Sequence, residues 1–512
     1  MTLSGRTKAH RMRFAFFDQE NATALFWVFV SLHAIVWTLL PILSQPNGHT
    51  DVIELLNWGR HPQWGYWKHP PLQAWIVGAV APMAGGSLWG VYLASQIANS
   101  ACFWAVWRTA REFLNPVYSL LSVLLLEGIL NYSSKSPKFA HDASQLLLWA
   151  FTVLFLWLAL NSGRVRYWLL CGVMIGLGLL SKYSIIFLLV PLLIFTLVNA
   201  NARRHFSTPG PYITAAIAAL IVAPHVIWLV RNDFTTVTYA LNRAESHGRV
   251  MDHLVNPLRF ASDQLLALIP TMILMGLLTY GSTSDRAKVT PSRSLRGFLF
   301  TVAIGPFLAL LVISAITGFR LHSGWGRPLW SFLGVFLLYH FQPVLTDKAL
   351  RRFSYAFLGY ATISAALFVG KFTLGPTLTG KVRPEHFPGQ AIAKHVTTEW
   401  VKRHGTPLPI VGGNKWFADN IGFYSPDRPD VYADLDPMKN PWTTDEVFNQ
   451  RGGIIIWNAV KDGSALPDAW RTRFPRAVVQ PGASFAWQTS ASVPPVELGW
   501  AIVPPSPLRS SP

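Results

Sequence analysis

Residues 49–72 read HTDVIELLNWGRHPQWGYWKHPPL, and they follow closely on an apolar run, residues 22–40, that is long enough to cross a bilayer. The stretch holds two carboxylates, two cations, three prolines and three tryptophans. Beside a membrane span, polar residues at this density are costly to keep unless they bind or catalyse something. The stretch therefore predicts a membrane protein whose functional groups gather in its first extracytoplasmic loop, residues 44–86.

The composition also indicates a membrane protein. The 512 residues are 51% hydrophobic and only 13% charged, whereas a soluble globular chain carries about 25% charged residues. The net charge of +18 is compatible with a nucleic-acid partner, but lysine and arginine recur between apolar runs and do not form one patch. That pattern is typical of cytoplasmic loops held against anionic lipid, so we expect membrane lipids as partners and no nucleic acid. Both cysteines, Cys102 and Cys171, lie in apolar runs, and no disulfide framework is predicted.

Apolar runs long enough to span recur along the chain and predict about eleven transmembrane helices. They are residues 22–40, 87–107, 116–132, 143–161, 167–181, 184–200, 211–230, 260–281, 297–317, 328–343 and 353–372. Residues 71–82 are too short to cross and are expected to lie along the interface. The first run could be a signal peptide, but no small-residue cleavage site follows it, so we interpret it as a retained span.

The charges between these runs predict the orientation of the chain. If the amino terminus, with Arg6, Lys8, Arg11 and Arg13, is cytoplasmic, every cytoplasmic loop is basic, as the positive-inside rule requires. These loops hold Arg108, Arg111, Arg164, Arg166, Arg203, Arg204, Arg286, Lys288, Arg293, Arg296, Lys348, Arg351 and Arg352. The opposite side mixes signs, with Asp51, Glu54, Lys68, Asp142, Arg231, Asp233, Arg243, Glu245 and Arg320. Mixed charge indicates a binding or catalytic site on that side.

The chain changes character after residue 372, where it becomes Pro-rich and polar with no further apolar run. Ile392, Val396 and Trp400 recur four apart and predict an amphipathic helix over residues 390–402. Residues 409–411 and 454–457 predict short buried strands. The expected fold is an all-α polytopic membrane protein, residues 1–375, followed by a small extracytoplasmic α/β domain, residues 380–512.

Asp51 and Glu54 are the first candidates for chemistry, because a spacing of three places them on one face of a helical turn. A carboxylate just outside the membrane can act as a general base toward a hydroxyl. Spacing alone supports an N-cap or a solvated interfacial acid equally well.

Lys68 and His69 precede two prolines that stiffen the backbone, and a cation fixed there could hold a lipid phosphate. The alternative is a lysine whose amine extends to the lipid headgroups. Lys138, His141 and Asp142 lie on the same predicted side; Asp142 is a candidate second acid or the cap of a helix beginning at residue 143.

Lys182 and Tyr183 interrupt an otherwise continuous apolar stretch, which marks a functional candidate or simply the turn between two spans. Arg243, Arg320 and His322 belong to later outer loops. Arginine suits phosphate because its planar fork donates two hydrogen bonds at once, although some of these arginines are expected to contact lipid.

The chain has no glycine-rich phosphate loop, no HExxH and no CxxC pair. Mn²⁺ or Mg²⁺ would suit the ligand types of Asp51, Glu54, His141 and Asp142. No spacing demands such an ion, so no cofactor is expected.

Together these residues resemble the C-type (GT-C) glycosyltransferases that use polyprenyl-phosphate sugars. The chain is similar to the bacterial branch related to protein O-mannosyltransferases, lipid A aminoarabinose transferases and rhizobial lipopolysaccharide galacturonosyltransferases. The resemblance covers roughly residues 20–370. The matching pieces are Asp51, the run Trp64 to Leu72, Asp142, Gly178 to Tyr183, Pro224 to Trp228, and Trp325 with Pro328.

The resemblance implies a helical membrane core with a cavity opening outward, in the inner membrane of a bacterium. Asp51 would be the catalytic base, and Asp142 would orient the acceptor or assist the base. The expected substrate contacts are Glu54, Tyr66, Lys68, His69, Lys138, His141, Lys182, Tyr183, Arg243, Arg320 and His322. The expected partners are a polyprenyl-phosphate-linked sugar and a periplasmic lipid or glycan acceptor such as lipopolysaccharide.

Two departures from the family pattern stand out. Val52 occupies a position where the family often has Glu, so the neighbouring acid is missing unless Glu54 replaces it. Lys68-His69 stands where aminoarabinose transferases have Glu-Lys before the two prolines, which displaces the cation by one position.

The implied reaction is an inverting single displacement at the anomeric carbon. The alternative from another class is a transporter or flippase of a lipid-linked saccharide. Transporters tend to show internal repeats, and the sequence has none that we detect. A third, weaker alternative is a non-catalytic receptor for envelope components.

Overall fold

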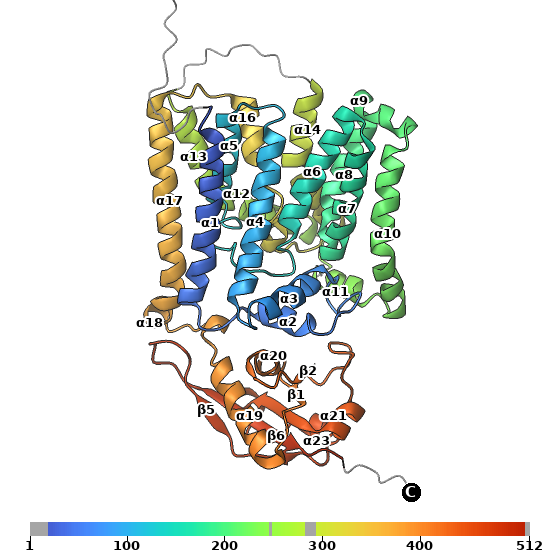
Figure 1. Ribbon diagram of the computed structural model, residues 1–512, viewed down its shortest axis with the longest axis vertical. Helices are drawn as coiled ribbons and strands as arrows, with labels where there is room; N and C mark the ends of the chain where they lie inside the picture. Colours follow the sequence, from blue (N-terminus) through green and yellow to red (C-terminus); the bar gives the residue numbers. More distant parts are fainter. Residues whose placement is uncertain (1–18, 245–247, 282–292, 507–512) are drawn as a thin grey trace, which may run out of the picture.

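The computed structural model describes residues 19–244, 248–281 and 293–506. Figure 1 shows a bundle of long helices and, at one end of it, a smaller α/β domain formed by the carboxyl-terminal part of the chain. The fold class predicted from the sequence is confirmed. Arg6, Lys8, Arg11, Arg13, Glu245, Arg286 and Lys288 of the predicted loops lie outside the described residues.

Four described helices are long and apolar enough to cross a membrane: α1 (Ala22–Ser44), α6 (Gln145–Ser162), α10 (Gly210–Arg231) and α17 (Asp347–Thr373). Three helix pairs, each bent by more than 40°, raise the number to at most seven if each pair forms one span. They are Tyr183–Val198 with Ala200–Ser207, α12 (Asp252–Ala267) with α13 (Ile269–Thr279), and α14 (Arg293–Ala303) with α15 (Gly305–Thr317).

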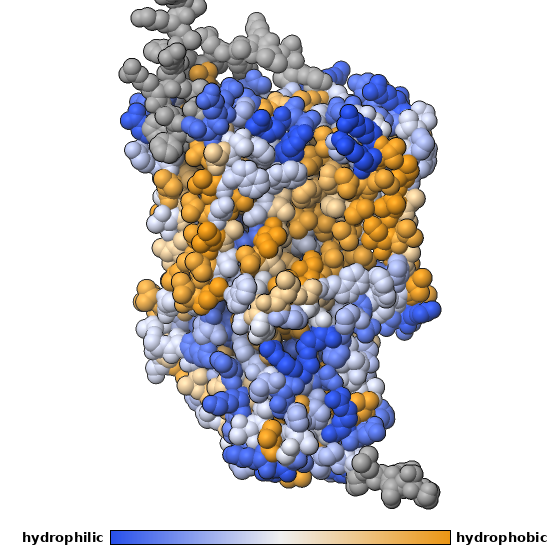
Figure 2. All heavy atoms as spheres, viewed as in Figure 1, coloured by the Kyte–Doolittle hydropathy of each residue, from blue (hydrophilic) through white to orange (hydrophobic). Residues whose placement is uncertain are grey.

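The predicted count of eleven spans is therefore not confirmed. Other predicted runs contain shorter helices: α5 (Pro116–Leu124) continues as a 3₁₀ turn to Gly128, α7 (Val165–Ser181) has 17 residues, and α16 (Leu333–Phe341) has nine. On the face drawn in Figure 2, an apolar band crosses the helical bundle between hydrophilic surfaces at its two ends, as expected for a multi-pass membrane protein.

The first loop forms two helices, α2 (Thr50–Trp58) and α3 (Leu72–Met83), which lie between the bundle and the α/β domain (Figure 1). Their backbones approach closely at two glycines, because a Cβ atom on Gly59 would lie 2.6 Å from the Cα of Gly78. Gln73 ties the start of α3 to the bundle by donating to the hydroxyls of Ser144 and Ser181 at 2.5 and 2.7 Å. The helix predicted to lie along the interface is thus α3, with 12 residues.

The helix α4 (Trp89–Ala110) carries buried polar side chains that hold the second loop, residues 129–144, in place. Ser95 Oγ donates to the carbonyl of Ser136 at 2.6 Å, and Gln96 donates to the Ser136 hydroxyl at 3.2 Å. These bonds fix the backbone just before Lys138, His141 and Asp142.

The α/β domain is built on one sheet with strand order β2-β1-β3-β6-β4, and β5 (Ala483–Phe485) also pairs with β6. The strands β1 (Ile410–Gly413), β2 (Asp430–Ala433) and β3 (Gly453–Asn458) are parallel, whereas β6 (Val496–Val503) runs antiparallel to β3 and to β4 (Val478–Val479). The predicted amphipathic helix is α19 (Gly389–His404), and Ile392, Val396 and Trp400 are buried as expected. Helix α20 (Lys415–Tyr424) packs against α2.

Candidate active site

A cavity of about 500 Å³ lies where the first and second loops meet the bundle. From the sequence, Asp51, Asp142 and the two prolines after His69 are expected on the same side of the membrane. In the structure, Asp51, Asp142 and Pro70 line this one cavity. The predicted site residues in its wall are Asp51, Lys68, His69, Lys138, His141, Asp142, Lys182, Tyr183, Arg243 and His322.

Asp51 lies in the first turn of α2, beside a cation from the second loop. Its backbone N–H donates to Nδ1 of His49, which is the N-cap residue, so the N-cap interpretation of Asp51 is wrong. Its carboxylate Oδ2 lies 2.7 Å from Nζ of Lys138. Burial opposes ionisation, yet His141 and Lys138 hold the pKa of Asp51 below its usual range. Asp51 is therefore ionised at neutral pH.

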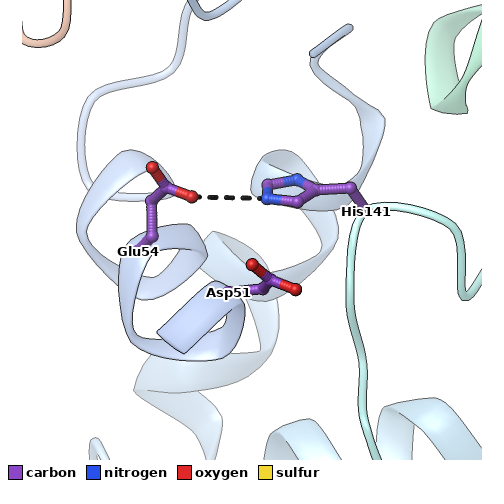
Figure 3. A group of neighbouring side chains, drawn as sticks. All are labelled: Asp51, Glu54 and His141. Carbon is purple, nitrogen blue, oxygen red and sulfur yellow. Dashed lines mark ion pairs between the residues drawn. The ribbon is translucent and has the colours of Figure 1, made fainter. Parts of the chain in front are cut away.

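Glu54, one turn further along α2, is buried behind the cavity and does not line it. Its Oε2 lies 2.5 Å from Nζ of Lys68 and 3.4 Å from Nε2 of His141 (Figure 3), and its Oε1 lies 3.1 Å from Nζ of Lys415. Against the cost of burial, Lys415 and Lys68 hold the pKa of Glu54 well below its usual range. The structure therefore places Glu54 as an anchor for α2 and Lys68, and its predicted contact with substrate stays a prediction.

Asp142 lines the same cavity as Asp51 and is paired with two cations. Nη1 of Arg327 donates to its Oδ1 at 3.2 Å, and Nζ of Lys182 lies 4.0 Å from its Oδ2. Burial raises the pKa of Asp142, but Lys182 and Arg327 lower it further and keep the group ionised. Helix α6 begins at Gln145 with Ser144 as its N-cap position, so the capping interpretation of Asp142 is wrong.

Tyr183 connects the cavity wall to α10 and α11 (Thr235–Arg243). Its hydroxyl lies 2.7 Å from Nε2 of His225 and 2.6 Å from Oγ1 of Thr236, and Nδ1 of His225 lies 2.6 Å from the carbonyl oxygen of Trp64. A Cβ atom on Gly65 would collide with the ring of Trp228. The Pro224 to Trp228 motif therefore holds the first loop against the bundle.

Arg243 and His322 form the opposite part of the wall, where the His322 ring lies 3.2 Å from the backbone carbonyl of Arg243. Besides Glu54, two further predicted substrate contacts are not brought into the cavity. Tyr66 is buried, stacks on Trp58 and donates to the carbonyls of Trp58 and His61, so it packs the first loop. Arg320 does not line the cavity.

Two functional residues were missed by the sequence interpretation. Arg327, which is buried, holds Asp142, and Lys415 from the α/β domain holds Glu54. Arg327 lies between Trp325 and Pro328, which belong to the family resemblance, whereas Lys415 lies in a region with no membrane or catalytic signal.

Asp51, Glu54 and His141 also form a group in which one ligand atom from each residue lies within 4.8 Å of the others. Asp142, the fourth residue of the predicted metal set, is outside that group. Glu54 already faces Lys68 and Lys415, and Asp51 faces Lys138. A divalent cation would have to displace these ammonium groups, so the residues fit a metal poorly and none is assigned a step.

An apolar groove of about 1420 Å³ adjoins the cavity and lies between α8 (Ile186–Val198) and the α14–α15 pair. Ile186, Phe187 and Ile313 line both spaces. The groove extends along α8 as far as Asn199 and Arg293. A cavity with several cations beside a long apolar groove suits a molecule with an anionic head and a hydrocarbon tail.

Comparison with known proteins bears out the resemblance predicted from the sequence. Residues 68–228 match the family model described as dolichyl-phosphate-mannose-protein mannosyltransferase. The lipopolysaccharide core galacturonosyltransferase RgtB of Rhizobium johnstonii is 24% identical over 88% of this chain and 90% of the relative. An undecaprenyl phosphate-α-4-amino-4-deoxy-L-arabinose arabinosyl transferase of Pseudomonas fluorescens is 27% identical over 32% of this chain and 29% of its own.

The fold has a counterpart among solved structures. ArnT from Cupriavidus metallidurans, bound to undecaprenyl phosphate, matches with a TM-score of 0.62 and 13% identity, covering 95% of this chain and all of ArnT. The same enzyme in the apo state matches with a TM-score of 0.54. At this identity the match concerns the fold alone, and it extends over the α/β domain as well as the helical bundle.

Proposed function

We propose that this multi-pass membrane protein, whose fold is that of an aminoarabinose transferase, moves a sugar from a polyprenyl-phosphate donor to an extracytoplasmic acceptor such as lipid A or lipopolysaccharide. The observation that carries the proposal is the cavity that holds both acids and several cations and that adjoins the apolar groove, with which it shares lining residues. Donor phosphate and sugar would occupy the cavity, and the polyprenyl chain would lie in the groove. The lipid substrates in the names of the relatives support this class of donor and acceptor.

The orientation is part of the proposal. Figure 1 shows α9 (Ala200–Arg203) and the beginning of α17 at the end of the bundle away from the α/β domain. These segments carry Arg203, Arg204, Lys348 and Arg352. By the positive-inside rule this end faces the cytoplasm, and the cavity and the α/β domain face the periplasm.

The proposed chemistry is a single displacement at the anomeric carbon. Asp51 takes the proton of an acceptor hydroxyl, whose oxygen forms the new bond to the anomeric carbon. The bond from that carbon to the phosphate oxygen breaks, its electron pair leaves with the lipid phosphate, and the configuration inverts. Lys182 and Arg243 stabilise the negative charge on the departing phosphate. The lipid phosphate is already a good leaving group. The reaction therefore needs little help from a strong base, and a carboxylate with a low pKa suffices.

The test compares Asp51→Asn with Asp468→Asn, a substitution of a solvent-exposed acid in the α/β domain. Purified protein is incubated with undecaprenyl-phosphate sugar and lipid A, and both substrates are followed by mass spectrometry. We expect D51N to reduce transfer by at least about a hundredfold, whereas D468N transfers at the wild-type rate. Normal transfer by D51N would remove Asp51 as base. Donor that crosses liposomes unconsumed would indicate the flippase alternative.

A further inference from the structure

A second cavity of about 380 Å³ lies beside the first, between the second loop, α17 and the segment leading into the α/β domain. The two cavities share Lys138, Ala140, Asp142 and Gly324 in their walls. His49, two residues before Asp51, lines the second cavity, and Asp51 lines the first. The pair Asp51–Lys138, with its 2.7 Å contact, therefore lies at the boundary between the two spaces.

The lining of the second cavity is strongly cationic. Among the described residues it includes five cations, namely Lys135, Lys138, Arg327, Lys371 and Arg383, against two acids, Asp142 and Glu385. Arg327 is paired with Asp142, and Lys138 is paired with Asp51. Within the described chain, no ion pair within 4 Å is formed by Lys135, Lys371 or Arg383. The cavity therefore has an excess of positive charge that its own acids do not neutralise.

A single lysine near the membrane interface commonly contacts lipid headgroups. Here the unpaired cations come from three separate elements: the second loop, α17, and the connection after α18 (Gly375–Thr379). Lys135, Lys371 and Arg383 are solvent-exposed and line one cavity that adjoins the proposed base. That arrangement suits a ligand with more than one anionic group, because separate charge-assisted hydrogen bonds require separate acceptors.

The proposed place of the donor is the first cavity, because Ile186, Phe187 and Ile313 line both that cavity and the apolar groove, whereas no described residue lines both the second cavity and the groove. We propose that the second cavity is the acceptor site and that Lys135, Lys371 and Arg383 bind phosphate or carboxylate groups on the acidic saccharide head of a lipid acceptor. This inference rests on the proposed function, which it deepens by naming the charge of the acceptor. A hydroxyl of an acceptor held there would reach Asp51 at the boundary between the two cavities, beside Lys138.

The test uses the double variant Lys371→Gln with Arg383→Gln in the full-length protein. Equilibrium binding of lipid A carrying two phosphates is measured by tryptophan fluorescence, independently of catalysis. Loss of two charge-assisted contacts should weaken binding by about tenfold or more and raise the acceptor KM similarly, with the donor KM unchanged. The charge-conserving pair Lys371→Arg with Arg383→Lys should retain most of the binding.

Two probes distinguish the source of the negative charge. Lipid A with its phosphates removed tests phosphate recognition, and dephosphorylated lipid A bearing carboxylate-containing core sugars tests carboxylate recognition. The anion whose presence on lipid A restores binding to the wild-type protein, but not to the double variant, is the group that the second cavity recognises. Wild-type binding that is unaffected by removing both kinds of anion, or a double variant that binds as the wild type does, would overturn the inference.

The outcomes of these measurements distinguish failure of the acceptor site from failure of the proposed function. Charge-dependent binding of lipid A without any transfer supports the acceptor site and contradicts the transferase activity with the donor tested. Transfer at an unchanged acceptor KM in the double variant supports the activity and overturns the acceptor site. A raised donor KM in place of a raised acceptor KM would also overturn it, because the second cavity would then hold the donor.

Discussion

The Nζ atom of Lys415, the first residue of α20, lies 3.1 Å from Oε1 of Glu54, one turn after Asp51 in α2. The same amine lies 2.5 Å from Oδ2 of Asp419, and Asn57 donates to the Asp419 backbone carbonyl at 2.9 Å. Burial lowers the pKa of the Lys415 amine, but Asp419 and Glu54 outweigh it, so the amine stays protonated. The α/β domain thus fixes the helix that carries the proposed base.

Lys415→Met should therefore affect both stability and turnover. Glu54 is buried and would lose one of its two lysine partners, which should destabilise the protein by about 2–4 kcal/mol. Displacement of α2 should lower kcat about tenfold or more, while the donor KM changes little. Thermal unfolding in detergent and steady-state kinetics measure the two effects. Lys402→Met, at an exposed lysine of α19, is the control.

A double-mutant cycle tests whether Lys415 acts through Glu54. If it does, Glu54→Gln combined with Lys415→Met should cost less than the sum of the single substitutions, by about 1 kcal/mol or more. Strictly additive losses would show that Lys415 acts independently of Glu54, through Asp419 alone.

Sequence reasoning predicted the parts of this site that are local in the chain. The apolar runs predicted the helices, and the polar loops between them predicted Asp51, Lys68 and Asp142 as a group. The pairs Lys415–Glu54 and Arg327–Asp142 were not predictable, because periodicity reports local structure and carries no information about which distant side chains meet.

Two other predictions that the structure does not confirm, the substrate contact of Tyr66 and the count of spans, also have physical causes. Tyr66 lies in an aromatic loop where a packed ring and a ligand-binding ring have the same sequence signature. The predicted count of eleven spans is not confirmed, because hydropathy finds apolar runs and does not register a bend within one. The helices before and after Asn199 are bent by 93°, although the residues on both sides are apolar enough to form one span.

Asp142→Asn should reduce transfer while leaving the donor bound. The carboxylate pairs with Arg327 and Lys182 and lines both cavities, so its loss should misplace the acceptor relative to Asp51. We expect kcat/KM for the acceptor to fall about tenfold to a hundredfold. Asp462→Asn, at an exposed acid of the α/β domain, should behave as the wild type does. A fall confined to donor affinity would instead assign Asp142 to the donor.

Chelation of divalent ions should leave transfer unchanged. The three candidate ligands Asp51, Glu54 and His141 already face Lys68, Lys138 and Lys415, whose ammonium groups supply the positive charge that a metal would bring. Transfer is measured before and after dialysis against EDTA, with Mg²⁺, Mn²⁺ or Zn²⁺ added back. Loss on dialysis and recovery with one ion would contradict this expectation.

The pH dependence of transfer follows from the directions of the pKa shifts. The pKa values of the carboxylates Asp51, Glu54 and Asp142 are lowered, so these groups remain negative at any pH above their usual titration range. Burial lowers the pKa values of the imidazoles of His49, His69 and His141, and nearby cations add to this effect at His49 and His69. A lowered imidazole pKa keeps these rings neutral at and above neutral pH.

None of these carboxylates and imidazoles should therefore change charge between about pH 6.5 and pH 9, and their titration should leave kcat/KM level across that interval. Below it, activity should fall only as the lowered pKa values of the histidines and then of the carboxylates are reached. Transfer is measured at constant ionic strength, because the exposed cations of the second cavity are screened by salt. An inflection near pH 7 that disappears in His141→Gln would show that this imidazole titrates in the working range, and Asp51 would then share its role as base.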